Sequence, residues 1–167
     1  MNGRRHSRLA VYGMLTGLAF VLSYVESLVP VPIPIPGVKL GLANLVTITG
    51  LYTVGVRGTA AVSLARILLA GLTFSGLSGM LYSLAGWGLS LGLMILARKT
   101  GWFSQTGVSI IGGVGHNVGQ LAAAALIVET AEVFYYLPVL LAAGCIAGAL
   151  IGLLAGLVTA RIQAVAR

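Results

Sequence analysis

The sequence contains no aspartate, and its only acidic residues are three glutamates, Glu26, Glu129 and Glu132. Charged residues make up 8% of its 167 residues, whereas a soluble domain usually has about a quarter of its residues charged. A chain with so few charges cannot cover a water-facing surface. Because 58% of its residues are hydrophobic and its mean hydropathy is +1.03, the sequence predicts an all-α integral membrane protein.

Several catalytic and redox signatures are also missing. The lone cysteine, Cys145, rules out an intrachain disulfide, and neither a C-x-x-C nor an H-E-x-x-H pattern occurs. The chain has no P-loop with which to hydrolyse ATP, and without aspartate it has no Ser-His-Asp triad. We therefore expect no catalytic residue, no metal site and no cofactor.

Six hydrophobic stretches divide the chain, which we interpret as one transmembrane domain over residues 1–167. A membrane-spanning helix needs about 20 residues. The predicted spans cover residues 9–29, 38–56, 59–74, 77–97, 107–128 and 137–160. An even number of spans places both termini on the same side, so the sequence predicts a six-transmembrane-helix bundle.

The distribution of positive charge predicts which side that is. Eight cations fall on the side of the termini: Arg4, Arg5, Arg8, Arg57, Arg98, Lys99, Arg161 and Arg167. Lys39 and the three glutamates fall toward the other side. By the positive-inside rule both termini are cytoplasmic, in a multi-pass protein of the cell membrane. The net charge of +7 thus reflects topology and not nucleic-acid binding.

Prolines occupy every second position from residue 30 to residue 36, between the first two predicted spans. This pattern forbids a helix and favours an extended chain, and we expect Pro32, Pro34, Pro36 and Gly37 to form a lid over a binding site. Lys39 follows at the predicted start of a helix, where unpaired backbone N–H groups attract anions. The alternative is a stiff surface loop whose lysine only marks the membrane boundary.

Polar side chains inside the predicted spans indicate a pocket beneath this loop. Arg66 and His116 fall near the middle of the bilayer, whereas Asn44 and Gln120 fall nearer the outer face. Gln120 is one helical turn from His116 and shares its face, with Asn117 beside them. Ionisable side chains in a membrane usually face a cavity or a partner. We therefore predict that these residues and the lysine of the loop line an outward-opening pocket.

The predicted pocket carries more positive than negative charge. Lys39 and Arg66 face Glu26 as the single acidic candidate from the spans, so a small anionic ligand could supply the missing counter-charge. Alternatively, Glu26 pairs with Lys39 or Arg66 as part of the structure. We interpret His116 as a hydrogen-bonding residue and not as a catalyst.

Glycine is the second organising feature, with 24 copies. Glycines recur every four residues in the sixth predicted span, at Gly144, Gly148, Gly152 and Gly156. Such stripes let helix backbones approach closely in lipid, and we assign this one to packing inside the bundle. Gly13 and Gly17 form a shorter stripe in the first span, which could equally meet an external partner.

Three runs of sequence resemble a known family: P-I-P-G-V-K-L-G-L-A-N at 34–44, G-V-G-H-N-V-G-Q at 113–120 and Y-L-P-V-L at 136–140. They resemble the Gx transporter family, many of whose members are labelled heptaprenyl diphosphate synthase component I. That family is similar to the substrate-binding S-components of energy-coupling factor vitamin transporters. The resemblance implies an S-component-like six-helix fold with a pocket toward the outer face. It also implies a partner module, made of a transmembrane coupling protein and two cytoplasmic ATPase subunits.

The resemblance also bears on docking and on the synthase label. S-components usually dock through an A-x-x-x-A pattern on the first helix, and here Gly13 and Gly17 stand at the matching positions. The label conflicts with the residues, because prenyl chain elongation needs aspartate-rich motifs that hold magnesium on the diphosphate. A chain without aspartate cannot supply them.

Two hypotheses from different classes remain. In the first, the protein is the substrate-binding subunit of an energy-coupling factor type importer for a small anionic or partly apolar compound. Lys39 and Arg66 would hold the anion, and four residues would orient the compound: Asn44, His116, Asn117 and Gln120. In the second, the protein is a non-catalytic membrane adaptor for a soluble enzyme of isoprenoid or quinone biosynthesis or of flavin-linked redox metabolism.

Overall fold

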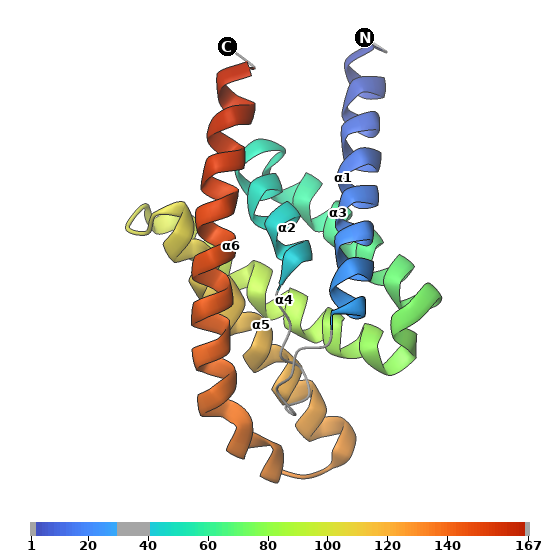
Figure 1. Ribbon diagram of the computed structural model, residues 1–167, viewed down its shortest axis with the longest axis vertical. Coiled ribbons are helices and arrows are strands. Elements are labelled where there is room, and N and C mark those ends of the chain that lie inside the picture. The colour runs from blue at the N-terminus through green and yellow to red at the C-terminus, as the bar shows by residue number, and fades with distance from the viewer. Residues whose placement is uncertain (1–2, 30–40, 166–167) are drawn as a thin grey trace.

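Helices account for all the regular secondary structure in the computed structural model, which describes residues 3–29 and 41–165 (Figure 1). The α-helices in these ranges are α1 (Gly3–Leu28), α2 (Leu42–Thr53), α3 (Gly55–Ala70), α4 (Gly76–Thr100), α5 (Gln105–Val128) and α6 (Leu137–Val165). A π-helical segment, η1 (Gly71–Ser75), joins α3 to α4, and a 3-10 segment, η2 (Glu132–Tyr136), precedes α6. The all-α prediction is confirmed.

Four stretches of the described residues are long and apolar enough to cross a membrane: Arg8–Leu28, Gly55–Thr100, Gln105–Val128 and Glu132–Val165. The second of these is 46 residues long and contains α3, η1 and α4. The chain is therefore a membrane protein. Helix α2 is apolar but has only 12 residues, which is shorter than the about 20 that a full crossing requires.

The second helix begins later than the sequence predicts. We expected a helix from about residue 38 to residue 56, but α2 begins at Leu42. Gly41 precedes it with φ 78° and ψ 26°, a left-handed conformation that glycine adopts without steric cost. A right-handed helix cannot pass through such a residue, so the predicted start was wrong.

Five residues predicted for the lid and the outer anion site lie outside the described ranges: Pro32, Pro34, Pro36, Gly37 and Lys39. Their predicted roles remain predictions.

A side chain from α4 holds the other end of α2. Arg98 donates a hydrogen bond from Nη1 to the backbone oxygen of Leu51. Its guanidinium carbon also lies 4.7 Å from the centroid of the Tyr52 ring, within the range of a cation–π contact. A cation is favourable here because the last carbonyl groups of a helix carry partial negative charge. Arg98 therefore fixes the end of α4 against the end of α2.

The six α-helices of residues 3–29 and 41–165 form a closed ring that does not follow the order of the chain. Helix α1 contacts α3, α3 contacts α4, α4 contacts α5, and α5 contacts α6. Helix α6 then contacts α2, and α2 contacts α1, which closes the ring. Helices α2 and α3 also contact each other across the ring. At this contact Thr47 and Ser63 share a hydrogen bond of 3.2 Å. The second helix thus separates the first helix from the last (Figure 1).

Glycines let α5 pack closely between α4 and α6. A Cβ atom at Gly119 would lie 2.7 Å from the backbone oxygen of Ala85 in α4. On the α6 side, Cβ atoms at Gly144 and Gly148 would lie 3.0 Å from the Gly113 oxygen and 2.7 Å from the Ile110 Cα atom. Close backbone packing of this kind holds helices together in lipid. The assignment of the α6 stripe to internal packing is confirmed for these two glycines and for Gly152, whose Cβ atom would lie 2.7 Å from the Thr106 Cα atom. It was wrong for Gly156, where a Cβ atom would meet nothing within 4 Å.

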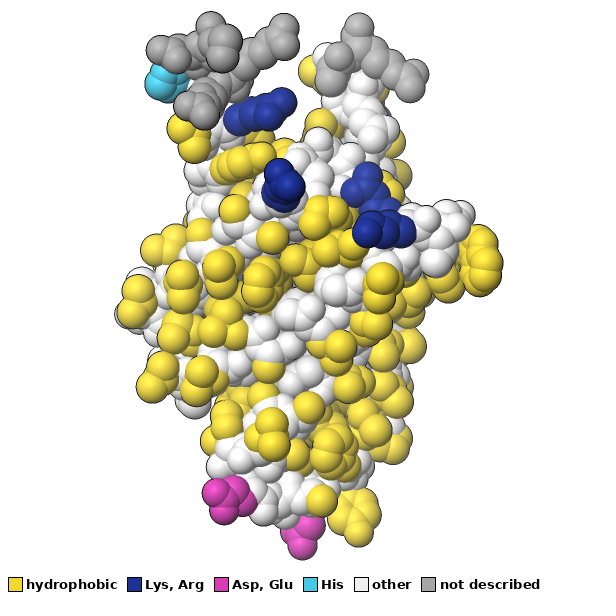
Figure 2. Space-filling view, turned by 180° about the vertical axis from the view of Figure 1, so that it is seen from behind, with side chains coloured by type: hydrophobic (Ala, Val, Ile, Leu, Met, Phe, Trp, Pro, Cys, Tyr) yellow, Lys and Arg dark blue, Asp and Glu magenta, His cyan; other side chains and the backbone are white. Residues whose placement is uncertain are grey.

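Charge is segregated along the long axis of the molecule. Helix α1 begins and α6 ends at the same end (Figure 1). Lys and Arg side chains gather toward that end, whereas acidic side chains appear at the opposite end (Figure 2). This separation matches the pattern that the sequence predicts for the two sides of the membrane.

Candidate binding cavity

A cavity of about 390 Å³ lies within the ring of helices. All six α-helices contribute to its lining, together with η1. Its size falls within the range of small-molecule sites, which is roughly 300–1,000 Å³. Four of the polar residues that the sequence predicts for a pocket line this cavity: Asn44, Arg66, His116 and Asn117.

Arg66 is the one lysine or arginine among the described lining residues. It projects from α3, and its Nε atom is buried without a hydrogen-bond partner. A buried donor without an acceptor costs free energy, and more so when the group is charged. Glu26 interacts with Arg66 electrostatically, but no ion pair closer than 4 Å joins these two described residues. The guanidinium therefore has hydrogen-bonding capacity left for a ligand.

Glu26 has another partner, which the sequence did not reveal. Its Oε1 atom accepts a hydrogen bond from the backbone N–H of Gly41, the residue immediately before α2. This contact joins the last turn of α1 to the start of α2. It also places the carboxylate at the positive end of the α2 dipole, which stabilises its charge. Glu26 is thus compensated in part without Arg66.

Two neighbouring residues of α5 line the cavity, and packing fixes both. Asn117 donates a hydrogen bond of 2.7 Å from Nδ2 to the backbone oxygen of Leu140 in α6. His116 packs against α4, where a Cβ atom at Gly86 would lie 2.8 Å from its Nδ1 atom. A glycine at position 86 is needed to make room for the ring. Together these contacts hold two polar groups at the wall of the cavity.

Gln120 lies behind this wall. It is 9% exposed, and it is not among the described residues that line the cavity. A Cβ atom at Gly86 would meet its Cγ atom at 2.9 Å as well as the His116 ring, so the predicted shared face with His116 is confirmed. Its Oε1 atom is buried without a hydrogen-bond partner. Gln120 can support His116, but in this structure it does not reach the cavity.

Serine side chains form a part of the lining that we did not predict. They come from α1, η1, α4 and α5: Ser23, Ser27, Ser75, Ser83, Ser90 and Ser109. Ser90 donates a hydrogen bond of 2.8 Å to the backbone oxygen of Gly112. Serine in an apolar helix is a weak signal, because hydroxyl groups also join helices where no cavity exists, as Thr47 and Ser63 do.

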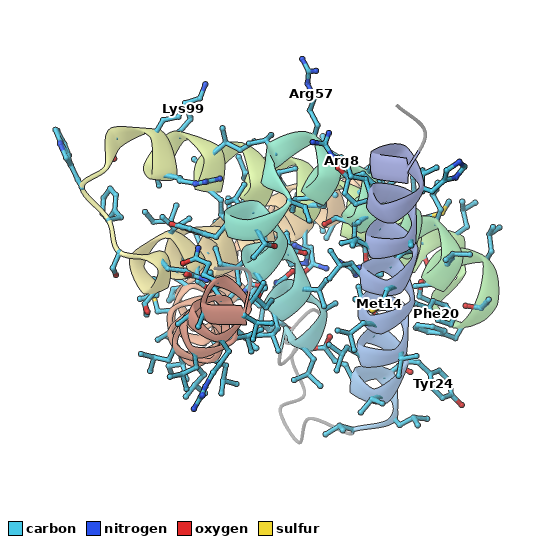
Figure 3. The ribbon with its side chains drawn as sticks, turned by 90° about the horizontal axis from the view of Figure 1, so that it is seen from above. Arg8, Met14, Phe20, Tyr24, Arg57 and Lys99 are labelled. Atoms are coloured by element: carbon cyan, nitrogen blue, oxygen red, sulfur yellow. The ribbon has the colours of Figure 1, made fainter. Side chains whose placement is uncertain are left out.

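An aromatic cluster lies beside the cavity, where α1 meets η1. The Phe74 ring of η1 lies 5.7 Å from the Phe20 ring and 5.5 Å from the Tyr24 ring, measured between centroids. Figure 3 shows Phe20 and Tyr24 on the side of α1 that faces this segment. Phe74 also lines the cavity, so it adds apolar surface to a lining that includes polar side chains of α5.

The predicted docking glycines lie on the outside of the molecule. Gly13 and Gly17 are exposed, and a Cβ atom at either position would meet nothing within 4 Å. Met14, between them, is 68% exposed and is labelled on α1 in Figure 3. This face of α1 is therefore available to lipid or to another protein.

The cavity-lining residues all fall within one family match. The family model of heptaprenyl diphosphate synthase component I matches residues 15–158 of the chain. The chain belongs to this family. No curated protein and no solved structure matches it. As a heptaprenyl diphosphate synthase component I family member with membrane-length helices, the protein is a membrane component, and the predicted family resemblance is confirmed.

Proposed function

We propose that this family member is the substrate-binding subunit of an energy-coupling factor type importer, similar to an S-component. Its substrate would be a small anionic or partly apolar compound. The observation that carries the proposal is the ring of helices around a cavity whose arginine has a buried, unpaired Nε atom. Buried charge of this kind in a membrane protein marks a ligand site or an ion pathway.

The proposed roles follow from the chemistry of the lining. Arg66 holds a carboxylate or phosphate group, because its planar guanidinium can donate two parallel hydrogen bonds to such a group. Asn44, His116 and Asn117 orient the compound through neutral hydrogen bonds. Phe74 and Met94 supply apolar surface. Lys39 is proposed as a second cation at the outer mouth, under a lid formed by the proline-rich segment, and Gln120 as a support for His116.

The proposed topology has six membrane spans with both termini in the cytoplasm of the cell. In it α3 and α4 cross separately, and α2 forms the core of the short second span. The common end of α1 and α6 and the cations gathered there support this orientation (Figures 1 and 2). In this orientation the exposed face of Gly13 and Gly17 meets the transmembrane coupling protein, which in turn carries two ATPase subunits.

A second candidate function is a non-catalytic membrane adaptor. The family description names a component of a synthase, which favours a soluble enzyme of isoprenoid or quinone metabolism as its partner. We propose no catalytic role, since the chain has no aspartate to hold magnesium on a diphosphate. Co-purification separates the two candidates: ATPase subunits support the importer, and a soluble synthase or redox enzyme supports the adaptor.

The cavity itself can be tested with two alanines of α6. Ala147 lines the cavity, whereas Ala142 is exposed on the outer surface of the same helix. Small molecules retained by the purified protein would be identified by untargeted mass spectrometry for the wild type, Ala147→Leu and Ala142→Leu. We expect the wild type and Ala142→Leu to retain a common compound, and Ala147→Leu to lose most of it. Equal retention by both variants would contradict a ligand in this cavity.

A further inference from the structure

A second hollow, of about 350 Å³, lies near the start of α1. Arg8, Val11 and Tyr12 of α1 form one side, and Thr53 and Val54 at the turn between α2 and α3 form the other. We call this the Arg8 groove. None of these residues lines the central cavity, so the groove is a separate feature.

The walls of the groove are both polar and apolar. A Cβ atom at Gly58 would lie 2.8 Å from the hydroxyl oxygen of Tyr12, so Tyr12 is held against the start of α3. The hydroxyl of Thr53 donates a hydrogen bond of 2.9 Å to the backbone oxygen of Thr49, which fixes its position and leaves its oxygen able to accept. Val11 and Val54 add apolar surface. The groove therefore pairs fixed hydroxyl groups and an arginine with a short hydrocarbon wall.

The charges around the groove favour an anion. Arg8 is exposed, and within the described chain no hydrogen bond or ion pair engages its guanidinium. Arg57, at the start of α3, and Lys99 project outward in the same direction in Figure 3. Glu26 lies at the far end of α1, and the acidic side chains visible in Figure 2 lie at the opposite end of the molecule. No described acidic residue is thus placed to neutralise Arg8.

We infer that the Arg8 groove binds the phosphate headgroup of an anionic phospholipid. The groove lies toward the end of the molecule where Lys and Arg side chains gather (Figure 2). In the proposed topology, on which this inference rests, that end lies at the cytoplasmic membrane boundary, at the depth of lipid phosphates. Arg8 would bind the phosphate, the hydroxyl groups of Tyr12 and Thr53 would contact the headgroup, and the glycerol and first acyl carbons would pack on Val11 and Val54. Basic pockets between helices on the cytoplasmic side bind phospholipid headgroups in this way. The inference does not depend on the function of the central cavity.

The test is a lipid titration of the detergent-purified, delipidated protein, read by native mass spectrometry. The probes are phosphatidylglycerol, phosphatidylcholine with the same acyl chains, and inorganic phosphate. We expect the wild type to bind the first phosphatidylglycerol more tightly than phosphatidylcholine. Arg8→Gln should lower that affinity about fivefold, the effect of one arginine at an anionic surface, and Arg8→Lys should keep most of it.

Arg161→Gln is the matched control, because Arg161 is exposed on α6 and does not line the groove. It should bind phosphatidylglycerol as the wild type does. Equal affinity of the wild type for the two lipids would overturn the inference, and so would equal losses in Arg8→Gln and Arg161→Gln. Displacement of bound phosphatidylglycerol by millimolar inorganic phosphate would assign the groove to free phosphate and would also overturn it.

Discussion

At the scale of single residues, Arg66 lacks a hydrogen-bond acceptor for part of its buried guanidinium. Its Nε atom is buried without an acceptor, whereas Glu26, its electrostatic partner, bonds to the backbone at the start of α2. Truncating one member of a desolvated charged pair usually costs about 2–5 kcal/mol. If a ligand anion is the missing partner, the cost will appear in ligand affinity and not in folding.

The first prediction concerns Arg66→Lys, which keeps the charge but loses the planar fork. We expect the affinity for the compound retained by the wild type to fall roughly thirtyfold or more, as measured by titration in nanodiscs. Arg57→Lys on the same helix should leave this affinity unchanged, because Arg57 is exposed and outside the cavity. Glu26→Gln should remain monodisperse, since an amide oxygen can still accept from Gly41. Aggregation of both Arg66→Lys and Glu26→Gln would show instead that the two residues form a structural pair.

The sequence alone predicted only some of the residues that line the cavity. It predicted which polar residues lie within the helices, because charged and amide side chains are rare in apolar runs. It could not predict that Gln120 turns behind the wall, because this depends on how closely α4 approaches at Gly86. The serines of the lining were missed because a hydroxyl group is compatible with both a cavity and a helix contact.

At the scale of elements, two glycine stripes that look alike in the sequence have different surroundings. Gly148 of α6 lies against the backbone of α5, whereas Gly13 and Gly17 of α1 face open space. Periodicity predicted that both stripes permit close packing, but it could not show which stripe already packs against another helix of the same chain. The start of α2 was missed for a related reason. The left-handed Gly41 is one glycine among 24, and composition does not distinguish it.

The second prediction uses this contrast. Gly13→Leu and Gly17→Leu should leave the thermal unfolding temperature of the isolated protein unchanged but abolish most co-purification with a membrane partner, because bulk prevents close helix approach. Gly148→Leu should destabilise the isolated protein by about 1–3 kcal/mol or more through overpacking. If the α1 variants co-purify with the partner as the wild type does, that face of α1 contacts only lipid.

At the scale of the whole molecule, topology is the property to measure. Helix α1 begins and α6 ends at the same end of the molecule, and the cations gather toward that end (Figures 1 and 2). Length and hydropathy alone identify four crossing stretches, since they do not separate α3 from α4 and they omit α2. The six-span proposal therefore depends on the side of the membrane on which each connection between helices lies.

The third prediction tests those connections by labelling single cysteines in a Cys145→Ala background. Cysteines at Lys99 and Ile162 should react with a membrane-impermeant reagent only after the cells are opened. Cysteines at Pro34 and Glu132 should react in intact cells. Labelling of the Lys99 position from outside would overturn the orientation. A fifth cysteine, at the exposed Arg57 in the first turn of α3, tests the span count, because it lies inside with six spans and outside if α2 does not cross, and labelling of it in intact cells would overturn the six-span proposal.

The closed ring of helices has a consequence for the order of events during synthesis. Helix α2 emerges from the ribosome second, yet its place in the ring is between α1 and α6, and α6 emerges last. One side of α2 must therefore wait for the end of the chain. A nascent chain that ends after α5 would have an open gap in its wall where α6 belongs, and Asn117 would lack the Leu140 oxygen to which it donates a hydrogen bond. The cavity is therefore complete only after the last helix has inserted, since α6 supplies part of its lining.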